Sequence, residues 1–193
     1  IRQRFKFLVD SGLKGSGDYG VFGLGFFNGQ TANVNEANNN VLVASRVSYP
    51  FLLSSGQIFE TSVQGYGQQY TLLSTKKTEQ DLRGAFTFVW YPQPLGFQSE
   101  WTFGRGPEYS AESNSVVPSP LRGGYIQTMW RTSVLDTPIV PFLRYQYYHG
   151  GKKIEDDARS HRVREWELGA EWQANSAFEL TAVYVISNRR TSD

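Results

Sequence analysis

The residues of this sequence best suited to bind a ligand are arginines at alternate positions in strand-like segments. Arg46, Arg83 and Arg144 each stand on the side of such a segment that lies opposite its aliphatic and aromatic residues. Arg131 shares its side with Gln127, but that segment is nearly equally apolar on both sides, so its orientation stays open. Guanidinium groups stay charged and offer five donors that fit phosphate oxygens. These four arginines are candidates for the lining of an anion pathway.

Arginines at such positions can instead pair with carboxylates and hold a sheet together. The polar sides of the predicted strands also carry acidic residues, at Glu60, Glu100, Glu165, Glu167, Glu171 and Glu179. With Arg4 and Lys6 of the first predicted strand, the bases on the polar sides also number six. Because acids and bases match in number, the sequence leaves both interpretations of the arginines open.

A second basic group lies in the polar segment near Tyr148–Arg162. Lys152, Lys153 and Arg162 could attract anions to the mouth of a pore. A charged run of this kind can also be a solvated loop, or can contact the phosphates of lipopolysaccharide.

The same segment suggests an enzyme as an alternative. Some outer-membrane barrels are proteases, and His149, Asp156, Asp157 and His161 lie close together here. A general base needs a positioned partner within hydrogen-bonding reach. The chain has two histidines and no recognisable serine nucleophile motif, so we expect no catalysis, no metal and no cofactor.

Ten segments with a period of two residues must position these side chains, and period-two alternation is typical of a sheet with two different faces. The predicted strands are Gln3–Asp10, Asp18–Phe27, Val41–Tyr49, Gln57–Gly65, Asp81–Tyr91, Gly96–Phe103, Arg122–Thr132, Ile139–Tyr148, Val163–Trp172 and Phe178–Ser187.

The breaks between these segments alternate between short and long. The short breaks lie near Asp10–Gly17, Pro50–Gly56, Tyr91–Gly96, Ser133–Pro138 and Gln173–Ala177. The long breaks, which we expect to be solvated loops, lie near Asn28–Asn40, Tyr66–Gln80, Gly104–Leu121 and Tyr148–Arg162. An up-and-down transmembrane β-barrel has tight turns at one end and longer loops at the other. The sequence therefore predicts an all-β, antiparallel transmembrane barrel.

Composition excludes other classes. The 193 residues include no cysteine, which excludes a disulfide framework, and the net charge is +1. No apolar run reaches the roughly 18 residues of a membrane-spanning helix. Basic residues are dispersed among acids, so we expect no nucleic-acid partner. A soluble β-rich binding module stays an alternative, although the alternation of breaks argues against it.

Several segments resemble the phosphate-selective porin O and P family of Gram-negative outer membranes. They are VFGLGFFNGQ, VLVASRVSYPF, RGGYIQTMWR, PFLRYQYYHGGKK and VREWELGAEWQANSAFELTAVYVIS. The resemblance implies a trimeric porin of 16 strands, embedded in lipid and lipopolysaccharide. It implies passive diffusion of small anions, such as phosphate or polyphosphate, with a general non-selective porin as the alternative.

The placement of the short turns also predicts where the chain lies in such a barrel. If the short turns are periplasmic, both ends of the chain lie on the outer side, whereas barrels of this class begin and end on the periplasmic side. We therefore expect residues 1–193 to form a single porin barrel segment, incomplete at both ends. The preferred anion and the constriction residues do not follow from the sequence.

Overall fold

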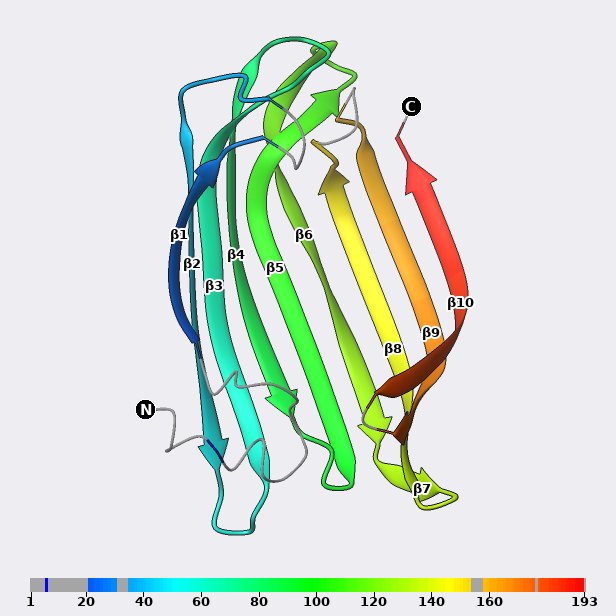
Figure 1. Cartoon of the computed structure of the whole chain (residues 1–193). Helices are drawn as coiled ribbons and strands as arrows, with labels where there is room; N and C mark the ends of the chain where they lie inside the picture. Colours follow the sequence, from blue (N-terminus) through cyan, green and yellow to red (C-terminus); the bar gives the residue numbers. More distant parts are fainter. Residues whose placement is uncertain (1–5, 7–20, 31–34, 154–157, 176, 193) are drawn as a thin grey trace.

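The computed structural model describes residues 6, 21–30, 35–153, 158–175 and 177–192. Ten strands form one antiparallel sheet in the order β1-β2-β3-β4-β5-β6-β8-β9-β10, with β7 paired to β8 (Figure 1). The strands are β1 (Val21–Asn28), β2 (Val41–Leu52), β3 (Ile58–Thr71), β4 (Thr78–Trp90), β5 (Leu95–Ser110), β6 (Ser115–Trp130), β7 (Thr132–Val134), β8 (Thr137–Gly151), β9 (Ser160–Asn175) and β10 (Phe178–Thr191). In the described ranges, no helix has the length and apolarity needed to cross a membrane.

The predicted all-β antiparallel fold is confirmed. Nine of the ten predicted strands correspond to β1–β6 and β8–β10. The predicted strand Gln3–Asp10 lies outside the described residues. The three-residue β7 was not predicted, and it belongs to the turn between β6 and β8.

The predictions of long loops near Tyr66–Gln80 and Gly104–Leu121 are wrong, because hydrogen-bonded strands continue through both segments. β3 and β4 extend the hairpin over much of Tyr66–Gln80, leaving only residues 72–77 between them. β5 and β6 do the same over Gly104–Leu121, leaving residues 111–114. The prolines in this hairpin are tolerated since β6 pairs with β8 only over Arg122–Met129, so the preceding stretch pairs on one side alone. A strand needs about 9–11 residues to span a bilayer, so these hairpins project beyond it.

The register gives the sheet two chemically distinct faces. Val47 pairs with Val63, Val63 with Phe86 and Phe86 with Trp101, so one face stays apolar from strand to strand. A slip of one residue would exchange the two faces.

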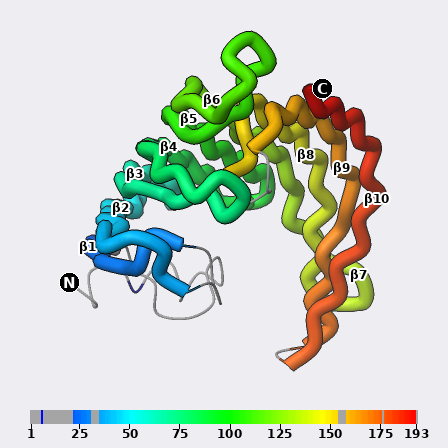
Figure 2. The backbone as a smooth tube through the Cα atoms, turned by 90° about the horizontal axis from the view of Figure 1, so that it is seen from above, coloured from blue at the N-terminus to red at the C-terminus, as the bar shows by residue number. Residues whose placement is uncertain are grey.

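Seen from above, the sheet is an open arc (Figure 2). Arg83 on β4, Gln146 on β8 and Arg189 on β10 share the polar face and line one recess, so the polar face is concave and the apolar face convex. We call the two sides the outward and inward faces.

Aromatic side chains of the outward face form a belt next to the short turns. Phe51 and Phe59 stack with ring centroids 4.8 Å apart, and Phe59 stacks on Trp90 at 6.1 Å. Phe88 approaches Phe97 on the next strand at 6.2 Å. Aromatic belts of this kind mark the interfacial region of membrane barrels.

The two faces should respond differently to a new charge. Leu168 points outward from β9 and is 63% exposed, whereas Val183 on the adjacent strand β10 points inward and is 46% exposed. In the full-length protein, Leu168→Arg should lower the free energy of unfolding in lipid vesicles by about 2–4 kcal/mol, because it places a charge in hydrocarbon. Urea titration of the refolded barrel measures this loss. Val183→Arg is the matched control, and an equal loss there would contradict the assignment of the faces.

Candidate lumen site

The inward face carries the polar side chains of the sheet. In the described strands its guanidinium groups are Arg46, Arg83, Arg144 and Arg189. Its carboxylates are Glu60, Glu79, Asp81, Glu100, Glu108, Glu165, Glu167, Glu171 and Glu179. The sheet therefore directs every carboxylate of its described strands to the inward face.

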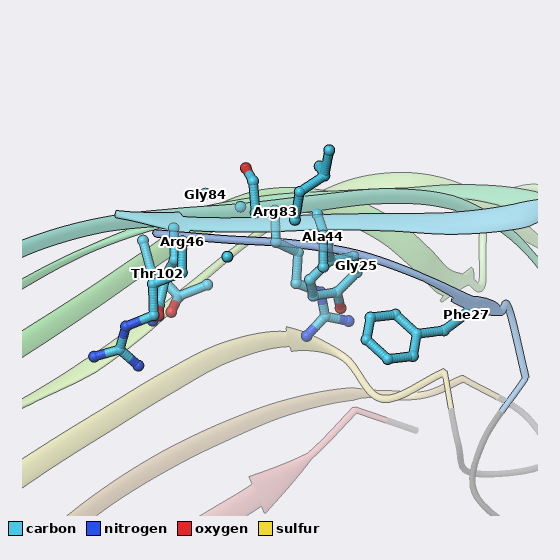
Figure 3. A pocket seen from close by; sticks show the side chains of 14 residues that line it. Gly25, Phe27, Ala44, Arg46, Arg83, Gly84 and Thr102 are labelled. Atoms are coloured by element: carbon cyan, nitrogen blue, oxygen red, sulfur yellow. The ribbon is translucent and has the colours of Figure 1, made fainter. Parts of the chain in front are cut away.

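Three recesses follow one another along this face. The first, of about 470 Å³, is lined by Arg46, Tyr66 and Arg83 among others, and the Arg46 and Arg83 side chains leave the same side of the sheet (Figure 3). The second, of about 460 Å³, shares Arg83 and also includes Lys152. The third, of about 380 Å³, shares Arg46 and lies toward the short turns, beside Tyr91. Arg46 and Arg83 thus lie at the borders between neighbouring recesses.

Asp81 is the most buried charge of the site. Its carboxylate is fully buried and accepts hydrogen bonds from Arg83 Nε at 2.9 Å, and from Tyr66 Oη and Gln68 Nε2 at 3.1 Å each. Lys153 forms an ion pair with the same carboxylate. A buried carboxylate needs partners of this kind, since burial without them is strongly unfavourable.

Lys153 attaches the segment that follows β8 to the inward face of β4. Its ammonium lies 4.9 Å from the ring centroid of Tyr70 and 5.3 Å from that of Tyr66. Burial lowers the pKa of Lys153 below its usual value, and the Asp81 carboxylate opposes that shift. Lys153 therefore acts in the structure as the partner of a wall carboxylate.

The other end of the same segment is also packed against the hairpins. Ala158 is fully buried in an apolar cluster with Leu72 and Val116, and its carbonyl accepts a hydrogen bond from the Tyr109 amide at 2.9 Å. A Cβ on Gly151 would lie 2.3 Å from the Pro107 carbonyl oxygen, so the chain must pass here without a side chain. Both described ends of the β8–β9 connection are therefore packed against the β3–β4 and β5–β6 hairpins.

Arg144 is held by the wall. Its Nε donates to Gln127 Oε1 at 2.7 Å and its Nη1 to Glu167 Oε2 at 3.1 Å. Its guanidinium also lies 5.2 Å from the ring centroid of Tyr125. The pairing that the sequence left open as an alternative thus applies to Arg144, whose charge is balanced by Glu167, and to Arg83, which shares the Asp81 carboxylate with Lys153.

Arg46 differs from these two arginines. It is exposed, and among the described residues its guanidinium has no hydrogen bond and no ion pair. Arg131 lies one residue beyond β6, where its amide donates to the Pro94 carbonyl at 2.8 Å, so it stands at the short-turn end of the wall.

The basic residues expected in one loop lie in three different places. Lys152 lines the second recess and Lys153 pairs with Asp81. Arg162 is not in the loop, because β9 begins at Ser160, and its side chain is on the outward face. Sequence reasoning did not select Asp81, although its spacing of two residues from Arg83 was a signal that both share a face.

The residues of the enzyme alternative do not come together. His149 has outward register on β8, whereas His161 has inward register on β9. Asp156 and Asp157 lie outside the described residues. Across the described part of the chain, no group of His, Cys, Asp and Glu side chains forms a candidate metal site.

A curved antiparallel meander with an apolar outward face and a recessed polar inward face is the wall of a membrane porin. The family model for the phosphate-selective porin O and P matches residues 74–193, which is more than half of the chain. The chain belongs to this family of outer-membrane porins. No curated protein and no solved structure matches it.

Removal of the Asp81 carboxylate should destabilise the wall. Asp81→Ala leaves Arg83 and Lys153 without their counterion, so we expect a loss of about 3–5 kcal/mol in the free energy of unfolding. Glu79→Ala is the matched control on the same face of the same strand, and it should cost less than about 1 kcal/mol. Urea unfolding of the reconstituted full-length protein measures both. Equal effects would show that the ion cluster does not stabilise the fold.

Proposed function

We propose that this porin conducts small anions by passive diffusion, with phosphate or polyphosphate as the preferred class. The proposal joins the description of the family to one observation, which is the unpaired, inward-facing guanidinium of Arg46. A lumen anion that approaches Arg46 meets a guanidinium that forms no ion pair with a described carboxylate, while Glu60 and Glu100 line the same recess. We also propose, from the family resemblance, that the porin is a homotrimer surrounded by lipid and lipopolysaccharide.

The recesses suggest a path with several weak sites. An anion would pass Lys152 and Arg83 in the second recess, then Arg46, which borders both the first and the third. Conduction needs sites that enrich the ion and still release it. Arg83 and Arg144 keep donor groups near the path while Asp81 and Glu167 limit their attraction, so neither is expected to hold an anion tightly.

A general, non-selective porin is the second candidate, and the balance of charge favours it. In the described strands the inward face carries nine carboxylates and four guanidinium groups. Because carboxylates outnumber guanidinium groups, the summed charge of these strands does not attract anions in preference to cations.

The reversal potential of the full-length protein under a KCl gradient in a planar bilayer separates the two candidates. Anion selectivity, with added phosphate reducing the chloride current, supports the proposal. Equal permeability of both ions, or cation selectivity, would replace the proposal with a general porin.

Arg46→Gln should weaken anion preference more than Arg144→Gln, because the charge of Arg144 is already balanced by Glu167. A unit charge at about 5 Å in a water-like dielectric contributes about 0.8 kcal/mol, so the anion permeability ratio should fall up to roughly four-fold. Arg131→Gln, at the short-turn end, is the control with little expected effect. Selectivity unchanged in both Arg46→Glu and Arg144→Glu would rule out a role for these arginines in the anion pathway.

A further inference from the structure

A row of basic side chains crosses the outward face near the loop end of the barrel. Arg122 on β6 pairs in register with His149, His149 with Arg162, and Arg162 with Arg190 on β10. Arg164 lies on the same face one rung closer to the short turns. We call these five residues the outer basic row, which lies across the upper parts of β6, β8, β9 and β10 in Figure 1.

The outer basic row has no acidic counterpart on its own face. Every carboxylate in the described strands has inward register, so the face that carries these arginines carries no strand carboxylate in the described ranges. Arg122, Arg162, Arg164 and Arg190 are exposed, and none of them takes part in an ion pair with another described residue. The outward face therefore has four guanidinium charges here that no described residue neutralises.

The height of the row places it at the membrane surface. Two rungs below it, Ile126, Tyr145, Trp166 and Ile186 pair across the same four strands. The next set of paired outward residues toward the short turns includes Leu143, Leu168 and Tyr184. The apolar band therefore begins at the Ile126–Ile186 level and continues toward the short turns. Each rung advances about 7 Å along a strand, so the row lies within about 15 Å of the first apolar rung, measured along the strand. Polar headgroups begin just above the hydrocarbon.

The row also contains small hollows between its side chains. Arg162, Arg164, Asn188 and Arg190 surround one of about 60 Å³. Another, of about 180 Å³, lies among His149, Arg162 and Arg190, with the hydroxyl-bearing Ser160, Thr191 and Ser192 around it. Guanidinium donors that converge from the neighbouring strands β9 and β10, with the His149 ring beside them on β8, suit a tetrahedral oxyanion.

We propose that the outer basic row binds the phosphate groups of lipid A, the lipid of the outer leaflet. The convergent guanidinium groups supply the charge and the donors, and the apolar rungs below contact the acyl chains of the same lipid. The inference uses the family's location in the outer membrane and is independent of which ion the lumen conducts.

A second copy of the chain fits this surface less well than a lipid does. A subunit contact would have to supply carboxylates opposite the arginines, and the outward face of the described strands offers none. Arginines placed against arginines would repel one another. A lipid phosphate meets the charge requirement without any contribution from a partner chain.

The test compares lipid A binding by the full-length porin with binding by a variant carrying Arg162→Gln, Arg164→Gln and Arg190→Gln together. The probe is bis-phosphorylated lipid A in phosphatidylcholine vesicles, and its binding is measured by native mass spectrometry and by quenching of tryptophan fluorescence. Three basic residues near an anionic surface each contribute about a factor of five, so affinity should fall roughly a hundred-fold. Dephosphorylated lipid A should bind both proteins equally weakly.

Arg189→Gln is the matched control, because Arg189 neighbours Arg190 on β10 but points inward and pairs with Glu165. Retained heat-modifiable migration in gels would show that each variant is folded. Unchanged lipid A affinity in the triple variant would overturn the proposal, as would equal loss in Arg189→Gln. Loss of oligomers with unchanged lipid binding would assign the row to a subunit contact instead. Displacement of lipid A by millimolar inorganic phosphate would overturn it in favour of a free-phosphate site.

Discussion

The antiparallel hydrogen-bonded ladder is the constraint on which the rest of this structure depends. Backbone polar groups cannot stay unpaired in hydrocarbon, so the strands must satisfy one another along their whole membrane-spanning length. Once the register is set, successive side chains of each strand point alternately to lipid and to water, so the position of a residue along its strand decides its face. The same ladder that keeps Val63 and Phe86 on the outward face keeps Arg46 and Asp81 on the inward face. The charge pattern of the wall is therefore a consequence of backbone pairing.

The alternation of side chains along each strand distributes acidic and basic residues unequally between the two faces. Carboxylates of the described strands all face inward, where Asp81 pairs with Arg83 and Lys153, Glu167 pairs with Arg144, and Arg46 stays exposed. On the outward face, Arg162 and Arg190 pair in register, and no carboxylate of the described strands shares that face. The inward pairs hold side chains of neighbouring strands together, whereas the outward arginines concentrate positive charge at the loop end of the sheet. Two different uses of arginine thus occur on the two sides of one sheet.

The loop end is held together by a buried ionic cluster and an apolar cluster acting on the same segment. Lys153 reaches Asp81 across the concave side, and Ala158 packs against Leu72 and Val116. Breaking the ion pair on either side would leave a buried charge uncompensated, which is costly in a protein interior. The described ends of the β8–β9 connection are consequently packed against the wall at this end.

The sequence by itself determined nine strands, the two faces and the inward direction of Arg46, Arg83 and Arg144, because a period of two residues is a local property of the chain. It did not determine where the loops end, since Gly, Ser and Pro in residues 104–121 suggest a loop until a partner strand is present to pair with them. Nor could it indicate that Lys153 meets Asp81, 72 residues away in sequence, or that Arg162 faces the lipid beside Arg190. These contacts were decided by the curvature and the lateral register of the sheet, which bring distant segments together and which no local pattern encodes.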